Sequence, residues 1–313
     1  MRPVFDLSVT VFLICLIAGA VLPAQEKKHP FSVHDMLAMD RISDAKVSPD
    51  GGWIVFTRRT TDMDGNRGRT DLWLVSSSGS DLKQLTTHTA GDWNPRWSSC
   101  GKHIFFLSSR SGSSQVWRIP LSGGEARQVT DLPLDAGNLV VSPAGGTIGF
   151  TMRVFPGKGD PDETKQKLNA IEDRKAGGII YEEIYIRHWD TWEDGRRSHF
   201  FVMDLKNNTL TNIMKGMDAN TPSEPFGGPG EITFTPDGKG VLFTAKNVGR
   251  SRAWSTDFDL YHAPVSGSKE PGCLTEKNEA WDTSPVFSPD GKKLAWLAMD
   301  VPGYESDRFR IKI

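Results

Sequence analysis

The stretch from Gly177 to Arg197 concentrates the residue types that could bind a small charged organic molecule. It reads Gly-Gly-Ile-Ile-Tyr-Glu-Glu-Ile-Tyr-Ile-Arg-His-Trp-Asp-Thr-Trp-Glu-Asp-Gly-Arg-Arg, so that aromatic rings alternate with paired charges. Carboxylates can hold an ammonium group, aromatic side chains can wall a pocket, and Arg187 can hold a carbonyl or a carboxylate. The same residues also fit an extra hairpin whose charges are solvated and whose tryptophans pack on the rim of a larger structure. The residues alone leave both interpretations open.

Other motifs that could support catalysis or metal binding are incomplete. Asp62-Met63-Asp64-Gly65-Asn66 resembles the start of a calcium loop, but its glycine comes one position early and no glutamate stands at the twelfth position, which favours a plain hairpin turn. Gly249-Arg250-Ser251-Arg252-Ala253 lacks the closing glycine of a nucleophile elbow. His188, His199 and His262 have no partners at zinc-ligand spacing. We therefore expect no metal, no cofactor and no catalytic residues in this chain.

A repeated phrase predicts the elements that must position the charged segment. Ser48-Pro49-Asp50-Gly51 returns four more times in recognisable form, at Ser98-Ser99-Cys100-Gly101, Ser142-Pro143-Ala144-Gly145, Thr235-Pro236-Asp237-Gly238 and Ser288-Pro289-Asp290-Gly291. Proline presets the first central position of a turn, and glycine accepts the positive φ that follows. The copies are spaced by about 44 to 53 residues, with one interval of about 93, and such a period is typical of propeller blades.

The repeat predicts an all-β fold, a β-propeller with four strands in each blade. Four complete blades are expected at 42–86, 92–130, 138–214 and 230–275, and a broken fifth blade starts near 282, so that 42–313 forms an incomplete propeller. The long interval holds an insertion at 153–198 in blade three. Its charged stretch from Asp160 to Lys175 permits a helix, which makes the insertion part-helical.

The first residues of the chain differ from the rest. An apolar run from Leu7 to Val21, with small residues near its end, predicts a secretory signal peptide over residues 1–24, and an uncleaved membrane anchor is the alternative. Residues 25–41 are expected to form a lead-in with a short helix, because Ser32 and Asp35 have the spacing of a helix N-cap. A secreted or periplasmic protein follows from the signal, with no membrane association once the signal is cleaved.

Composition limits the possible partners. The 37 Lys and Arg against 39 Asp and Glu give a formal net charge of −2, which offers no basic surface to nucleic acid. The 10 Trp and 16 Phe supply the large side chains that wedge-shaped blade interfaces need. After removal of the signal, Cys100 and Cys273 remain in different blades, and we expect two free thiols.

Three segments resemble the propeller domain of the prolyl oligopeptidase family of serine peptidases. They are His29-Pro30-Phe31-Ser32-Val33-His34-Asp35-Met36-Leu37, Ile42-Ser43-Asp44-Ala45-Lys46-Val47-Ser48-Pro49-Asp50-Gly51 and Arg187-His188-Trp189-Asp190-Thr191-Trp192-Glu193-Asp194-Gly195. The resemblance runs from about His29 to the end of the chain and is strongest to the exported dipeptidyl-peptidase and acylaminoacyl-peptidase-like branch. The Ser-Pro-Asp-Gly repeats alone are less specific, because exported propellers such as TolB share them.

The resemblance implies a seven-bladed propeller followed by an α/β-hydrolase domain with a Ser-Asp-His triad. That domain is absent from this chain, which would then be the substrate-gating propeller part of a secreted serine exopeptidase and inactive alone. The parent enzyme would release dipeptides or acyl-amino acids from short peptides, so that the implied partners are these peptides and the C-terminal hydrolase domain. The alternative is a non-catalytic, TolB-like exported propeller that binds a protein partner.

The resemblance also implies candidate binding residues. In dipeptidyl-peptidase branches, acidic residues that project from the propeller hold the free amino terminus of the substrate. Carried to this sequence, that role implies Glu182 and Glu183, with Arg187, Trp189 and Trp192 as neighbours in the pocket. Successive side chains of a strand point to opposite faces, so only one of the two glutamates can face the pocket if the stretch is a strand.

Overall fold

The computed structural model describes residues 29–181 and 187–313, and the chain divides into two compact units after Met39. In the smaller unit, helix α2 (Val33–Ala38) begins after Ser32, whose Oγ accepts a hydrogen bond from the backbone N of Asp35. The Asp35 carboxylate in turn accepts from the backbone N of Ser32 at 2.7 Å. This capping box confirms the helix expected after Ser32. The expected signal peptide, residues 1–24, lies outside the described residues.

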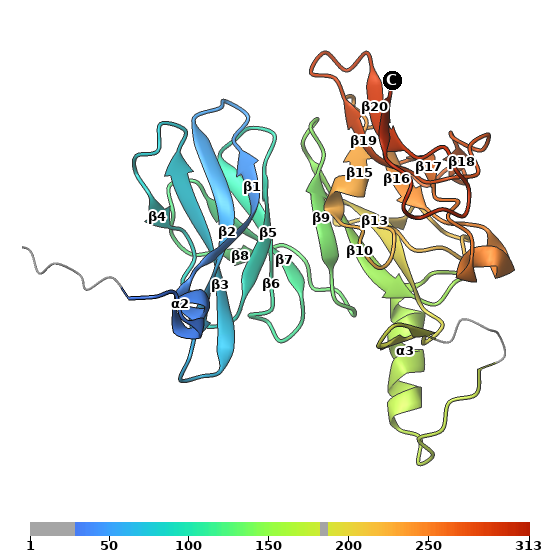
Figure 1. Ribbon diagram of the computed structural model, residues 1–313, viewed down its shortest axis with the longest axis horizontal. Helices are drawn as coiled ribbons and strands as arrows, with labels where there is room; N and C mark the ends of the chain where they lie inside the picture. Colours follow the sequence, from blue (N-terminus) through green and yellow to red (C-terminus); the bar gives the residue numbers. More distant parts are fainter. Residues whose placement is uncertain (1–28, 182–186) are drawn as a thin grey trace, which may run out of the picture. The chain divides into compact units, whose positions relative to one another are not determined.

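The larger unit, Asp40–Ile313, is built from antiparallel sheets that follow one another along the chain (Figure 1). Among the described residues, four of these sheets contain four strands and the last contains three, and a separate two-stranded sheet, β11 (Arg187–His188) with β12 (Thr191–Trp192), is inserted within the third. The strands are β1 (Arg41–Val47), β2 (Trp53–Asp62), β3 (Arg67–Ser76) and β4 (Lys83–Gln84); β5 (Asp92–Trp97), β6 (His103–Ser108), β7 (Gln115–Pro120) and β8 (Arg127–Gln128); β9 (Gly137–Val141), β10 (Thr147–Val154), β13 (Arg197–Asp204) and β14 (Leu210–Asn212); β15 (Ile232–Phe234), β16 (Gly240–Ala245), β17 (Asp259–Pro264) and β18 (Gly272–Cys273); and β19 (Asp282–Phe287), β20 (Leu294–Ala298) and β21 (Arg310–Lys312).

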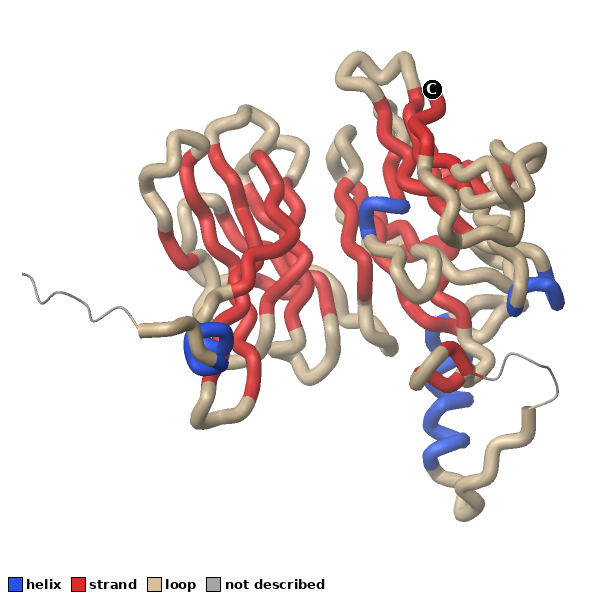
Figure 2. Tube along the Cα trace, in the orientation of Figure 1, coloured by secondary structure: helices blue, strands red, loops and turns tan. Residues whose placement is uncertain are grey.

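Strands dominate this unit, which confirms the all-β class (Figure 2). The short helices lie in connections: α3 (Pro161–Glu172) and the 3-10 turns η1 (Pro229–Glu231) and η2 (Gly249–Ala253). Among the helices that the structure describes, none is long and apolar enough to cross a membrane. Cys100 and Cys273 are free thiols.

The Ser-Pro-Asp-Gly turns owe their shape to one side-chain arrangement. The Ser48 hydroxyl donates to Asp50 Oδ1 at 2.5 Å and accepts from the backbone N of Trp53 at 2.9 Å. Gly51 takes a φ of 74°, as the turn requires. The same pair of contacts recurs at Ser288, at 2.5 and 3.0 Å. The turn chemistry expected from the sequence is therefore confirmed as a local, self-contained device.

The turns of consecutive sheets also approach one another closely. A Cβ added to Gly101 would lie 3.6 Å from Cδ of Pro49 in the preceding turn, and one added to Gly291 would lie 3.0 Å from Cβ of Pro236. Both glycines have positive φ as well. Glycine is thus favoured twice at these positions, by the backbone conformation and by the neighbouring proline. Sheets that are consecutive in the sequence are therefore neighbours in space.

A threonine closes the outer edge of these sheets. Thr130 Oγ1 accepts from the backbone N of Val116 at 2.9 Å and donates to Gln115 Oε1 at 2.8 Å. In the fourth sheet, Thr275 Oγ1 donates to Asp259 Oδ1 at 2.7 Å in the same way. The fourth strand ends before the threonine in both sheets. The threonine side chain replaces the ladder hydrogen bonds that the strand no longer makes.

The apolar core lies between consecutive sheets, as strand β6 illustrates. Ile104 and Phe106 are fully buried against Leu72 of β3 in the first sheet. Phe105 and Leu107 point to the other face and join the cluster that contains β10 of the third sheet. Side chains alternate between the two faces of a strand, so a strand buried on both faces reads as one continuous apolar run. The second sheet therefore packs between the first and the third.

Gly149, in β10, offers a test of this packing. A Cβ added there would lie 2.1 Å from Cζ of Phe200, which is fully buried on the neighbouring strand β13. Gly149→Ala is expected to lower the free energy of unfolding by about 1–3 kcal/mol in urea denaturation, because the ring must leave its place. Gly52→Ala, whose Cβ would meet Asp50 at 3.5 Å, is the control and should change it by less than about 0.5 kcal/mol. Equal losses in both variants would contradict the packing argument.

Helix α3 and a small hairpin interrupt the third sheet in sequence without disturbing its pairing. Strands β10 and β13 pair without a shift from Thr147 opposite Asp204 to Val154 opposite Arg197. The connection between them contains α3, β11 (Arg187–His188) and β12 (Thr191–Trp192). It therefore leaves and re-enters the sheet at the end where Val154 and Arg197 lie, and this end positions the candidate site.

Candidate functional site

The predicted binding residues that the structure describes lie on the β11–β12 hairpin. Arg187 is paired with Trp192 across the hairpin, and its Cζ lies 5.5 Å from the centre of the Trp192 ring, a cation–π contact. Trp189 and Trp192 are 65% and 54% exposed, so both rings are available to a ligand or partner. Glu182 and Glu183, the predicted carboxylates, lie outside the described residues.

Trp189 connects this hairpin to a second loop. Its φ is 51°, which is unusual for a bulky residue and turns the chain between β11 and β12. Its ring meets the ring of Phe226 edge-on at 5.3 Å between centroids. Phe226 belongs to the loop that follows β14 and is itself 73% exposed. Two segments separated in sequence thus form one exposed aromatic surface beside the insertion.

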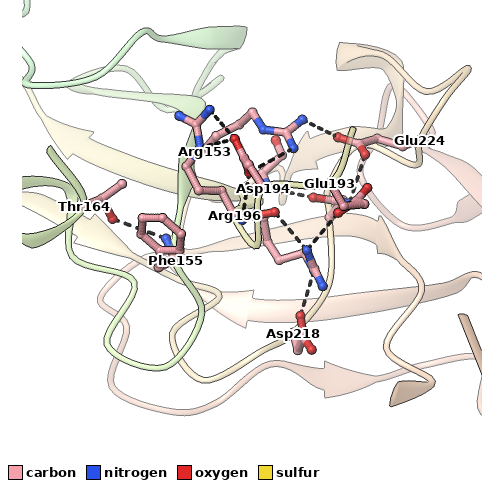
Figure 3. A network of polar contacts seen from close by, with 11 residues as sticks. Arg153, Phe155, Thr164, Glu193, Asp194, Arg196, Asp218 and Glu224 are labelled. Carbon is pink, nitrogen blue, oxygen red and sulfur yellow. Dashed lines mark hydrogen bonds and ion pairs between the residues drawn. The ribbon is translucent and has the colours of Figure 1, made fainter. Parts of the chain in front are cut away.

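A network of ion pairs lies next to this surface at the end of β10 and β13 (Figure 3). Arg197, only 5% exposed, places Nη1 3.1 Å from Glu193 Oε2 and Nε 2.7 Å from Asp218 Oδ1. Arg153 places Nη1 3.1 Å from Glu224 Oε1. Three carboxylates from two separate segments therefore gather around two guanidinium groups.

The secondary structure explains why these side chains meet. Arg153 is near the end of β10, and Arg197 is the first residue of β13, opposite Val154. The segment between β12 and β13 supplies Glu193, and the loop after β14 supplies Asp218 and Glu224. Neighbouring strands thus bring the arginines together, and the two loops at the same end carry their partners.

These groups surround a small recess with a free volume of about 40 Å³. Its lining includes three carboxylates, Glu193, Asp218 and Glu224, and three cationic side chains, Arg197, Lys246 and Arg252. A recess of this size admits a few water molecules or a single ammonium group. It is too small for a whole amino acid side chain of average size.

A larger groove of about 530 Å³ shares part of this lining. Glu193, Arg197 and Arg252 border both spaces. The groove adds apolar walls from Phe155, Ile179, Ile180 and Tyr181. A molecule with a charged end and an apolar body could therefore place its end in the recess and its body in the groove.

Burial changes the ionisation of two groups in the recess. Desolvation raises the pKa of Glu224 above the usual range, because it outweighs the attraction of Arg153, and the nearby Glu193 carboxylate adds to the increase. Burial also lowers the pKa of Lys246, whose Nζ donates to the backbone O of Ser255 at 2.9 Å. Glu224 is paired with Arg153 and accepts from Asn220 Nδ2 at 3.1 Å, but its side chain is 36% exposed and can still accept a hydrogen bond from a further cation.

This arrangement can bind a ligand through charge and shape. Within 29–181 and 187–313, no group of three or more His, Cys, Asp and Glu is arranged to hold a metal ion. The carboxylates can accept hydrogen bonds from an ammonium group, and Arg197 and Arg252 border the groove where carbonyl oxygens of the same molecule would lie.

The sequence predicted the binding residues of the hairpin but not the carboxylates that line the recess. Glu193 follows Trp192 directly and Arg197 stands in the same charged segment, so their closeness in the sequence was a signal that could have paired them. Asp218 and Glu224 gave no such signal, because they follow the charged segment only after β13 and β14. Their contribution depends on the pairing of β10 with β13.

The relatives found by sequence are dipeptidyl-peptidases. No protein-family model matches the chain. Dipeptidyl-peptidase 5 of Porphyromonas endodontalis is 32% identical over 280 residues, which cover 88% of this chain and 39% of the relative. Dipeptidyl-peptidase 5 of Porphyromonas gingivalis is 30% identical over 279 residues, covering 88% and 40%. The chain thus spans about two fifths of the length of these relatives.

Solved structures show a similar fold at much lower identity. Acylaminoacyl peptidase of Pyrococcus horikoshii gives a TM-score of 0.63 at 14% identity, covering 88% of this chain and 38% of that one. A putative TolB from Agrobacterium tumefaciens gives a TM-score of 0.51 at 17% identity, covering 83% and 71%. These two likenesses concern the fold alone.

Proposed function

The chain belongs to the dipeptidyl-peptidase and acylaminoacyl-peptidase-like proteins of the prolyl oligopeptidase family, whose N-terminal part it matches, and on this premise we propose that it binds the free amino end of short peptides for a serine exopeptidase. The exopeptidase releases dipeptides or acyl-amino acids. Its Ser-Asp-His triad belongs to a hydrolase domain of the parent protein, and this chain gates access to it. The five sheets are four complete blades and part of a fifth blade of a seven-bladed propeller.

The proposal includes the place where the protein works. Residues 1–24 act as a secretory signal, so that the mature protein is secreted or periplasmic. Peptides and the hydrolase domain are its partners. Nucleic acid is not among the proposed partners, because a formal net charge of −2 offers it no basic surface.

The single observation that carries the proposal is the recess of ammonium size that Glu224 lines together with Glu193 and Asp218. The free amino group of a peptide can donate charge-assisted hydrogen bonds to these carboxylates, because the side chains of Glu224 and Asp218 are 36% and 54% exposed. The adjoining groove then accommodates the first side chains of the peptide, and the ring of Trp192 lies 6.0 Å from that of Tyr181 in the groove wall.

Glu224→Gln tests this role in the full-length protein that contains the chain. The KM for Ala-Ala-p-nitroanilide is expected to rise about 10–100-fold, because a hydrogen bond between charged groups is lost, while the KM for N-acetyl-Ala-p-nitroanilide stays unchanged. Glu163→Gln is the control. Glu163 lies on α3 in an exposed ion pair with Lys158, and its replacement should change the KM for neither substrate. Equal increases for both substrates would sink the role of Glu224 as an amine anchor.

The same assay ranks the carboxylates that the sequence predicted. Glu182→Ala and Glu183→Ala are compared with Glu224→Gln on free and blocked substrates. A selective effect of either one on the free amine would add that residue to the anchor.

A second candidate function follows from the likeness to the TolB fold. A folded full-length protein that hydrolyses neither substrate, under conditions where a related dipeptidyl-peptidase does, would favour a non-catalytic module that binds a protein partner.

A further inference from the structure

Glu231 is a buried acid that lies outside the recess but holds the loop that reaches into it. Its side chain is buried, with the residue only 8% exposed. Oε2 accepts from the backbone N of Ser223 at 2.7 Å, and Oε1 accepts from the Ser223 hydroxyl, also at 2.7 Å. The Thr283 side chain of β19 also hydrogen-bonds to this carboxylate. One carboxylate thus fixes both polar groups of a single loop residue.

Ser223 begins a tight turn that presents Glu224 and Phe226. The backbone N of Gly227 donates to the carbonyl of Ser223 at 2.7 Å, which closes the turn. A Cβ on Gly227 would lie 2.2 Å from that carbonyl oxygen, so the turn has no room for a side chain there. The position of Ser223 therefore determines where Glu224 points.

The opposite side of the loop is fixed by β13. The backbone N of Ser198 donates to Asn220 Oδ1 at 2.7 Å, and its hydroxyl donates to the carbonyl of Thr221 at 2.8 Å. Asn220 Nδ2 then donates to Glu224 Oε2 at 3.1 Å. The loop is thus held at two points, by Ser198 in the third sheet and by Glu231 at the start of the fourth.

We infer that Glu231 is a positioning residue for the amine site: its contacts with Ser223 hold Glu224 in the recess and thereby set the selectivity for peptides with a free amino end. This inference rests on the proposed function of Glu224. Glu231 itself touches no substrate, and its effect reaches the ligand only through the Ser223–Gly227 turn.

A double-mutant cycle in the full-length protein separates positioning from general support of the fold. Glu231→Gln keeps the shape of the side chain but loses one of the two acceptors. It is expected to raise the KM for Ala-Ala-p-nitroanilide about tenfold, with kcat and the KM for N-acetyl-Ala-p-nitroanilide unchanged. Ser223→Ala, which keeps the backbone contact, should raise the KM for the free amine about threefold. In the Glu224→Gln background, Glu231→Gln should add less than a further twofold.

The outcomes distinguish this inference from the function on which it rests. If Glu224→Gln leaves both KM values as they are in the wild type, the proposed function and this inference are overturned together. If Glu224→Gln raises the KM for the free-amine substrate selectively but Glu231→Gln leaves that KM unchanged, the inference alone is overturned. A Glu231→Gln effect that is equal on both substrates or fully additive with Glu224→Gln also overturns the inference alone. Thermal unfolding of each variant identifies any that fails to fold, in which case Ser223→Ala decides.

Discussion

Replacing Arg197 with methionine is expected to lower the free energy of unfolding by about 3–5 kcal/mol. The guanidinium of Arg197 is the cationic partner of Glu193 at 3.1 Å, and the Glu193 side chain is only 10% exposed. Asp218, the second partner of Arg197, is 54% exposed and can turn to water. Removal of Arg197 therefore leaves one carboxylate buried without its cation, and the large cost comes from that group.

Two comparisons check the prediction in urea denaturation. Arg196→Met removes a neighbouring arginine whose partner, Asp194, is 39% exposed, and should cost no more than about 1 kcal/mol. The double variant Glu193→Gln/Arg197→Met leaves no uncompensated charge and should recover most of the loss. Equal costs for Arg196→Met and Arg197→Met would show that burial of the ion pair has no special weight.

The repeating part of the fold could be predicted because its causes are local. The hydroxyl of Ser48, the carboxylate of Asp50 and the positive φ of Gly51 lie within four residues, so the sequence itself contains the whole turn. Strand β6 could be predicted for a similar reason. Its apolar residues are continuous, which is expected of a strand that is buried on both faces. Such features need no knowledge of distant partners.

The recess could not be predicted because its causes are distant. In the sequence, Arg196 and Arg197 look alike, yet the first lies in an exposed pair with Asp194 and the second is buried between two loops. The difference arises from the pairing of Val154 with Arg197 and from a loop that begins after β14. Glu224 enters only through that loop. The sequence therefore predicted the charged segment with its tryptophans, but not the carboxylates of Asp218 and Glu224 that the loop after β14 brings to the recess.

His199 shows how a buried polar residue links the insertion to the sheet. It is fully buried on β13, and its Nε2 donates to the carbonyl of Met217 at 3.0 Å. The amide of Asn212 is oriented by two other contacts, since its Oδ1 accepts from the backbone N of Met214 and its Nδ2 donates to the carbonyl of Gly159. Nδ2 therefore also faces Nδ1 of His199, at 3.1 Å, as a donor, and the ring must remain neutral to accept.

Acidification is therefore expected to destabilise the protein through His199. Burial lowers the pKa of His199 to about 4, whereas an unfolded histidine titrates near the ordinary value of 6.5. Between these values the unfolded state binds more protons, so the free energy of unfolding falls as the pH decreases from about 6.5 to about 4, by about 3 kcal/mol in total from this group. Urea denaturation across this range measures the fall, and His199→Gln should remove it, whereas His262→Gln, at an exposed position on β17, should not. Asp257, whose pKa burial raises to about 6, binds its proton in the folded state within this range and opposes the fall, and ordinary paired carboxylates begin to lose their contribution below about pH 5. A fall that persists unchanged in His199→Gln would therefore assign the acid sensitivity to other groups. A fall that disappears in His199→Gln would assign the loss of stability between about pH 6.5 and 4 to the protonation of His199.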